Sequence, residues 1–85
     1  MMTPEEVSEY NEEALIADGL DEALIGVAER INLGPVAAYS VEKIYEILMN
    51  RDGMTYEEAI EFFDYNIKGA WMGEYTPVYV YTNEE

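Results

Sequence analysis

The sequence predicts a small α+β domain: a three-stranded, mainly antiparallel sheet with two helices packed on one face, and a further helix at the N-terminus. Two segments, about 40–51 and 56–68, repeat apolar residues at helical spacing and begin with capping residues. Three short runs are apolar, or alternate in polarity, as strands do. The chain has 85 residues, 49% of them apolar, which suffices for one domain with a small core. The predicted order is α-β-β-α-α-β.

The N-terminal helix is predicted over about residues 4–16. Thr3 can cap it, Pro4 suits the first helical position, and Glu6 stands where a capping box requires an acid. The apolar stripe of this helix is narrow, so we expect it to dock only loosely on the rest of the chain. The predicted organisation is an acidic helical extension over residues 1–18 and a single α+β domain over residues 19–82.

The first predicted strand covers residues 23–29, ALIGVAE, and is expected to lie at the centre of the sheet with both faces buried. A helix is the rival interpretation, because Ala, Leu and Glu are helix formers. A loop over residues 32–34 then leads to a second strand over residues 36–39. Pro35 opens that strand at a position that needs no amide donor. Residues 78–81 alternate in polarity and form the third strand.

Alternation along the strands divides the apolar residues between two sheet faces. We expect the helices to cover the face that holds Ile25, Val27, Val36 and Val78. The opposite face then holds Leu24, Ala28, Tyr39, Tyr79 and Tyr81. Either the N-terminal helix or a second copy of the chain would cover that face, and a second copy would make the protein a homodimer.

Capping residues mark the two remaining helices. Ser40 caps the helix over residues 40–51, and Gly53 suits the left-handed position just after it. Thr55 and Glu58 form a capping box at the start of the helix over residues 56–68. Gly69 or Gly73 ends that helix.

The Asp-Gly pair at residues 52–53 lies in an acidic context and invites comparison with a calcium-binding EF-hand loop. Such a loop has glycine sixth, an acid or amide first and a bidentate Glu twelfth. With Gly53 sixth, those two ligand positions fall on Leu48 and Ala59. We therefore expect a helix stop and a new helix start here, and no metal site.

Acidic residues dominate the composition. Nineteen Asp and Glu face four Lys and Arg, for a formal net charge of −15. Such a surface repels nucleic acid and anionic membranes, so neither is an expected partner. It attracts a protein with a basic surface and accelerates its approach at low salt. No signal peptide or membrane span is recognisable, so a cytoplasmic location is expected.

Several kinds of chemistry lack their usual residues. The chain has no histidine and no cysteine, which removes the common general base, thiol catalysis and thiolate metal sites. No glycine-rich phosphate-binding motif occurs. Carboxylates cluster on the outer face of the helix over residues 56–68, but that spacing is typical of a solvated surface. We expect no catalytic residue and no cofactor.

A candidate partner-binding patch lies near the end of that helix. Phe62 and Tyr65 fall away from its core stripe, and Trp71 and Met72 follow within a short turn. Aromatic residues ringed by acids, here Glu58 and Glu61, are typical of recognition surfaces. A purely structural role is also open, in which Phe62 packs under the N-terminal helix and Trp71 closes the edge of the core.

Part of the sequence resembles a known group of proteins. The shared segments are ALIGVAER, YSVEK at residues 39–43, and RDGMTYEEAIEFFDYN leading into GAWMGEYTP. Over residues 19–80 the chain resembles small hypothetical proteins of tailed bacteriophages, cyanophages among them. The resemblance implies a phage accessory protein that works in the host cytoplasm. The group has no assigned activity, so the resemblance implies no functional residue.

The acidic charge, the aromatic patch and the resemblance predict a small, acidic, non-catalytic phage accessory protein that binds a host or phage protein with a basic surface. A different hypothesis is a DNA mimic that inhibits a nucleic-acid-binding enzyme, its carboxylates imitating phosphates. The sequence is also compatible with a homodimeric structural protein of unknown role, and with a weak binder of divalent metal ions.

Overall fold

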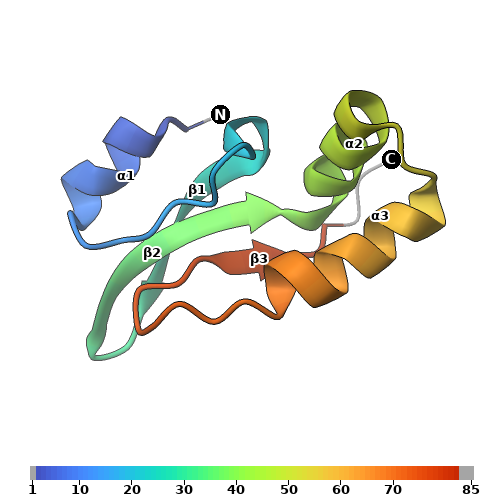
Figure 1. The fold of residues 1–85 in the computed structure, drawn as a ribbon. Coiled ribbons are helices and arrows are strands. Elements are labelled where there is room, and N and C mark those ends of the chain that lie inside the picture. The colour runs from blue at the N-terminus through green and yellow to red at the C-terminus, as the bar shows by residue number, and fades with distance from the viewer. Residues whose placement is uncertain (1, 83–85) are drawn as a thin grey trace.

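The computed structural model describes residues 2–82 and has the predicted α+β order (Figure 1). In chain order the elements are α1 (Pro4–Tyr10), the 3₁₀ turn η1 (Asp21–Ala23), β1 (Leu24–Arg30), β2 (Leu33–Ser40), α2 (Val41–Asp52), α3 (Tyr56–Phe62), the π-helix η2 (Phe63–Lys68) and β3 (Val78–Val80). Figure 1 shows α2 and α3 together at the end of the sheet to which β2 and β3 point, and α1 toward the opposite end. None of the helices described is long and apolar enough to cross a membrane.

The sheet is mixed, so the expectation of a mainly antiparallel sheet is wrong. β1 and β2 pair antiparallel through a short turn, whereas β2 and β3 pair parallel. Parallel neighbours need a long crossover between them. Here α2, α3 and η2 supply it, and they return the chain to the edge of β2 that β1 leaves open.

β2 lies at the centre of the sheet, where β1 was expected. Residues 36–40 of β2 are all buried, so β2 is the strand covered on both faces. β1 instead forms an edge, and Ile25 within it is 40% exposed. The most apolar segment is therefore not the central strand. In β2 the side chains of Ala37 and Ala38 are buried, although they contribute little apolar volume.

The expected division of residues between the sheet faces is also wrong. Leu24 pairs with Tyr39 and Val27 pairs with Ala37, with an irregularity in β1 between Leu24 and Gly26. The extra residue in this bulge puts Leu24 and Val27 on one face although they are three positions apart. That face belongs to the core, together with Tyr39 and Tyr79. Ile25, expected under the helices, turns outward.

The turn between β1 and β2 is tighter than expected. It consists of Ile31 and Asn32 alone, and Asn32 adopts the left-handed conformation with φ of 63°. Asparagine tolerates this conformation better than most residues. Pro35 lies inside β2, next to a second irregularity between the pairs formed by Ala28 and Arg30, where a missing amide donor is accommodated.

α1 has the predicted start but ends at Tyr10, not near residue 16. Thr3 and Glu6 make both hydrogen bonds of the capping box. At the other end, Asn11 leaves the helical conformation and its side-chain amide donates to the Pro35 carbonyl over 2.9 Å. The acids at residues 12–13 would lie at the negative end of the helix dipole, which disfavours continuing the helix. Val7 is buried in the core, so α1 packs against the rest of the domain. The domain boundary at residue 18 stays a prediction.

The caps of the other helices are confirmed. The Ser40 side chain accepts from the Lys43 amide, and Gly53 ends α2 with φ of 73°. Thr55 and Glu58 make the second capping box. Helical structure then continues to Lys68 as predicted, but from Phe63 onward it is a π-helix.

Aromatic rings connect the sheet to the helices. The rings of Tyr39 and Tyr79 lie 6.1 Å apart on neighbouring strands, and Phe63 meets Tyr79 edge to face at 5.3 Å. Tyr45 of α2 then meets Phe63 at 5.8 Å. Edge-to-face pairs of this kind contribute about 0.5–1.5 kcal/mol each beyond their buried area. The Tyr39 phenol also accepts a hydrogen bond from the Ala17 amide over 2.9 Å.

Replacing Tyr39 with phenylalanine should lower the free energy of unfolding by about 1–3 kcal/mol, because the Ala17 amide loses its acceptor while the ring stays in place. Urea unfolding followed by circular dichroism measures the change. Tyr10→Phe, at an exposed position on α1, is the matched control and should leave stability unchanged. Equal stability of the two variants would show that this hydrogen bond does not hold the segment.

Stability should fall as the pH rises above about 10, because burial raises the pKa of Tyr39 and of Tyr79 above the ordinary value. The unfolded phenols then ionise first, so the unfolded state binds fewer protons and gains stability relative to the folded state. Urea unfolding at about pH 8 and about pH 11 measures the loss. Tyr79→Phe should weaken this pH dependence and Tyr10→Phe should not. The same dependence in both variants would contradict the assignment.

Candidate functional site

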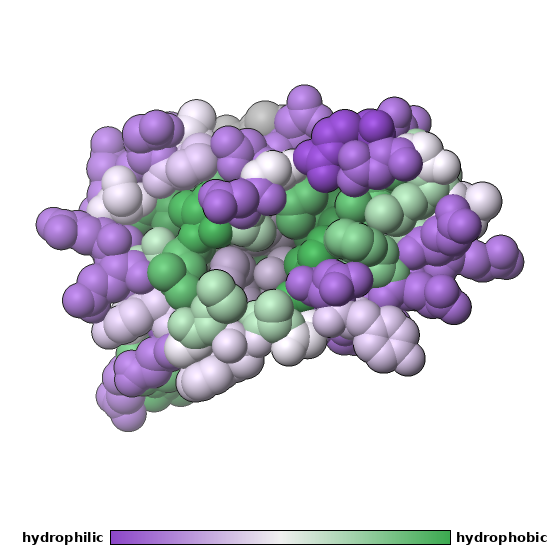
Figure 2. Space-filling view, in the orientation of Figure 1, coloured by the Kyte–Doolittle hydropathy of each residue, from purple (hydrophilic) through white to green (hydrophobic). Residues whose placement is uncertain are grey.

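An apolar groove runs along the end of the helical layer. It has a volume of about 430 Å³ and lies between the segment after α1 and the helix formed by α3 and η2. One wall comes from Leu15, Ile16, Ala17, Asp18 and Leu20, and the other from Phe62, Asn66, Ile67, Ala70 and Met72. The rest of the lining is Leu48, Arg51, Thr76, Pro77 and Tyr79. Figure 2 shows apolar surface gathered in the hollowed middle of the face seen there, with hydrophilic side chains around it.

A shallower acidic hollow lies on the other side of α3. It is lined by Met54, Glu58, Glu61, Phe62, Tyr65 and Asn66. Phe62 and Asn66 line both the groove and the hollow, so their side chains form the wall between the two. The two concavities are therefore neighbours on one surface and differ in character: the groove is apolar and the hollow is flanked by carboxylates.

Local structure fixes how these side chains are presented. A Glu58 carboxylate oxygen accepts from the Thr55 amide over 2.9 Å, so this side chain is held by the capping box. Glu61, one turn nearer the groove, is exposed. The change to π-helix directly after Phe62 widens the turn that carries Asn66 and Ile67, and π-helical turns occur frequently at functional sites.

The structure brings together most of the residues proposed from sequence. Glu58, Glu61, Phe62 and Tyr65 line the hollow, and Met72 joins Phe62 in the groove. Phe62 is 38% exposed, Tyr65 80% and Met72 68%. Trp71 lines neither concavity. It is 74% exposed, which excludes the purely structural role in which it closes the edge of the core.

Sequence reasoning missed the opposite wall of the groove. Leu15 and Ile16 were expected at the end of a helix, but they lie in a segment without regular secondary structure, held where the Leu15 amide donates to the Tyr75 carbonyl over 3.0 Å. The signal that was available is the pair of acids at residues 12–13, which shortens the helix. The structural role considered for Phe62 was packing under the N-terminal helix. Phe62 instead lines the groove, where it is 38% exposed, and the opposite wall is the segment that follows α1.

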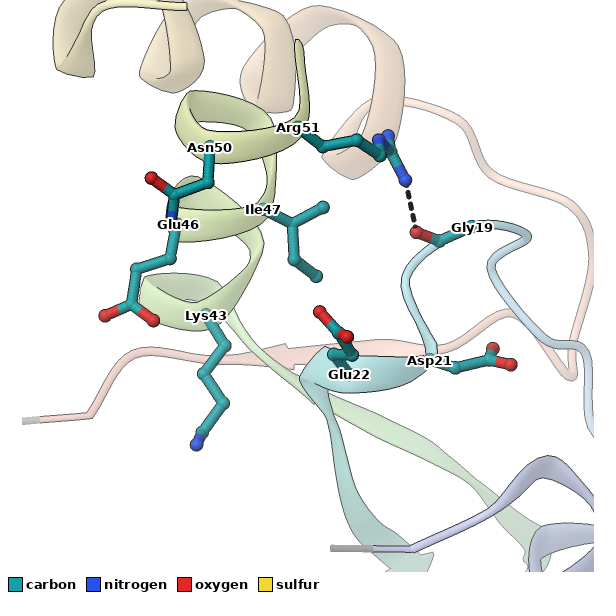
Figure 3. A pocket seen from close by; sticks show the side chains of 8 residues that line it. All are labelled: Gly19, Asp21, Glu22, Lys43, Glu46, Ile47, Asn50 and Arg51. Atoms are coloured by element: carbon teal, nitrogen blue, oxygen red, sulfur yellow. Dashed lines mark hydrogen bonds between the residues drawn. The ribbon is translucent and has the colours of Figure 1, made fainter. Parts of the chain in front are cut away.

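A third concavity, of about 740 Å³ and lined mainly by charged and polar residues, lies between α2 and the turn before β1 (Figure 3). Arg51 reaches across its upper end and donates to the Gly19 carbonyl over 2.7 Å, while Lys43 points away from Arg51. Arg51 also pairs with Asp52 at 3.0 Å, and this hydrogen bond raises the pKa of Arg51 and lowers the pKa of Asp52. The guanidinium therefore fastens the turn to α2, and the remaining charges of the cavity do not converge on one point.

Carboxylates are numerous but dispersed. Within residues 2–82, no three acidic side chains gather closely enough to hold a metal ion. No protein-family model, curated protein or solved structure matches the chain. The surface formed by the apolar groove and the acidic hollow is therefore the best-defined candidate site, on its geometry alone.

The fluorescence of Trp71, the chain's single tryptophan, should report an exposed side chain. We expect acrylamide to quench it almost as efficiently in the folded protein as in urea, because little protein shields the ring. Relative to its quenching of a free tryptophan analogue, caesium should quench Trp71 better than iodide does, because the net charge of −15 attracts cations. Strong protection from acrylamide in the folded protein would contradict the position described.

Proposed function

We propose that this chain is a small, non-catalytic phage accessory protein that binds a host or phage protein with a basic surface in the host cytoplasm. The binding surface consists of the apolar groove, the acidic hollow and the exposed turn that carries Trp71. The phage context rests on the resemblance of residues 19–80, and the mode of action rests on the residues of the surface.

The observation that carries the proposal is the exposure of large apolar side chains in one stretch of chain. Phe62, Tyr65, Trp71 and Met72 lie within 11 residues and all are more than a third exposed. Clustered exposed aromatic residues beside a concave surface are typical of protein-binding sites, and aromatic residues commonly dominate the binding energy there.

The charge distribution supports a basic partner. Two of the four basic residues pair with acids, Arg51 with Asp52 and Lys68 with Asp64. Because 19 acids face only four bases, and Glu61 is exposed, the field near the surface is negative. Such a field accelerates association with a cationic protein and weakens as salt is added.

The same face argues against a DNA mimic. Mimicry needs carboxylates in a continuous row that follows the spacing of backbone phosphates. In Figure 2 the hydrophilic side chains surround an apolar middle and do not form one continuous row on this face, which a nucleic-acid-binding cleft would not match. A non-catalytic role is supported by the lack of histidine and cysteine in the chain and by the dispersal of the carboxylates among the described residues.

The test begins with affinity capture of a partner from phage-infected host lysate on the immobilised chain, followed by binding measurements with the purified partner. Phe62→Ala and Trp71→Ala should each weaken binding by about tenfold or more, as central aromatic residues do. Raising the salt concentration should lower the association rate more than it changes the dissociation rate.

Tyr10→Ala is the matched control, since Tyr10 is an exposed aromatic residue on α1, away from the proposed surface. Circular dichroism establishes that each variant is folded. If folded Phe62→Ala and Trp71→Ala variants keep full affinity for the partner, or if Tyr10→Ala loses as much as they do, the proposed surface is wrong. A captured partner with an acidic surface and no salt dependence would contradict the electrostatic part.

A further inference from the structure

The wall between the groove and the hollow determines what shape of ligand can use both. Phe62 and Asn66 are four residues apart and adjacent on the helix surface, so they form a single row of side chains. A ligand that fills the groove and also reaches Glu58 or Glu61 has to cross this row. Its contacting groups must therefore lie on either side of a ridge about one side chain wide.

We infer that the apolar groove and the acidic hollow together bind a cationic amphipathic helix of a partner protein, which straddles the ridge formed by Phe62 and Asn66. Apolar side chains of the helix enter the groove, and a lysine or arginine three or four positions away reaches the hollow. This inference rests on the proposed function and adds the form and chemistry of the segment that is recognised.

The lining of the groove favours a helix over an extended peptide. The groove presents mainly apolar side chains, and the Leu15 amide in its wall already donates to Tyr75. An extended peptide lying in it would bury its own amide and carbonyl groups without partners, which is unfavourable. A helix satisfies its backbone groups internally and offers only side chains, as in other helix-in-groove complexes.

The spacing of side chains on a helix also fits the ridge. Residues three or four apart on a helix have Cβ atoms about 5–6 Å apart, which leaves room for one row of side chains between them. This is the ridges-into-grooves arrangement by which helices pack in proteins generally. The partner's cation then meets Glu61, which the fold leaves exposed, while Glu58 contributes the carboxylate oxygen that faces away from the cap.

Charge selects a cationic occupant over a second copy of this chain. Two copies would bring formal charges of −15 each into contact, and the resulting repulsion opposes association at low salt. The same negative field attracts a helix that carries lysine or arginine. The surface is thus unsuited to a homodimer unless the acids are neutralised.

A pair of synthetic peptides tests the inference directly. Each is an alanine-based helix of about 16 residues, long enough to form in part when free. In the matched peptide, two leucines lie in one stripe along the helix. Each of two lysines lies four positions from a leucine, in the adjacent stripe. In the permuted peptide, the same lysines lie on the opposite face, so composition and net charge are identical. Fluorescence anisotropy of labelled peptide at low salt gives the dissociation constants.

We expect the matched peptide to bind about tenfold more tightly than the permuted one, since only the first can fill both concavities. Phe62→Ala and Ala70→Phe should each weaken its binding about tenfold, the first by removing the ridge and the second by filling the groove. Neither change alters the charge of the protein.

Two charge-matched double variants separate a local contact from the general field. Glu58→Gln with Glu61→Gln should weaken matched-peptide binding about three- to tenfold, and the Gln side chain at position 58 can still serve the capping box. Glu9→Gln with Glu12→Gln removes the same charge at exposed positions near α1 and should have a smaller effect.

Equal binding of the two peptides, binding of neither, or equal effects of the two double variants would each overturn the inference. The proposed function has its own test, which is independent of the peptides. If the captured partner still loses affinity with Phe62→Ala and Trp71→Ala, the protein-binding surface stands and only its preference for a cationic helix is wrong.

Discussion

The buried side chain of Tyr39 is the constraint on which the rest of the structure depends. Its ring lies on the central strand, contacts Tyr79 of the last strand and through it Phe63 of the helical layer. Its phenol oxygen accepts from the Ala17 amide and so holds the segment that follows α1. One residue therefore links the central strand to the last strand, through Tyr79 to the helical layer, and holds one wall of the apolar groove. A small domain has few core residues to share such tasks, so each carries several.

Local signals predicted the elements well. The caps at Thr3, Ser40 and Thr55 act within one turn of helix, and the left-handed position of Gly53 follows from its lack of a side chain. What the sequence did not reveal depends on contacts between distant segments. The bulge after Leu24 reverses which residues of β1 face inward, and its one local signal is Gly26, because a glycine inside a strand often marks a bulge. The parallel pairing of β3 depends on how the crossover packs, which is likewise a property of the whole chain.

The same distinction applies to the candidate site: features within one helix could be predicted, and features formed between distant segments could not. Phe62, Tyr65 and the two glutamates could be recognised because they share a helix, where spacing in sequence translates directly into position. The groove could not, because one of its walls includes Leu15 and Ile16, and that segment is held by a hydrogen bond from Leu15 to Tyr75 far along the chain. Trp71 was recognised as unusual, but its position outside both concavities depends on the course of the turn after η2. Patterns within an element are therefore informative about function, whereas concavities between elements need the fold.

The parallel pairing of the last strand also bears on how the chain acquires its structure. β1 and β2 are adjacent in sequence and can pair early, but Ser40 meets Val80 across a separation of 40 positions (80 − 40 = 40). Closing so long a loop costs entropy that only the finished core repays. Until β3 arrives, Phe63 lacks Tyr79 and the hairpin has an uncovered side. On a ribosome, the chain can therefore complete its native structure only after almost all of the described residues have emerged. Until then, repulsion between the acidic residues of neighbouring nascent chains keeps these chains apart.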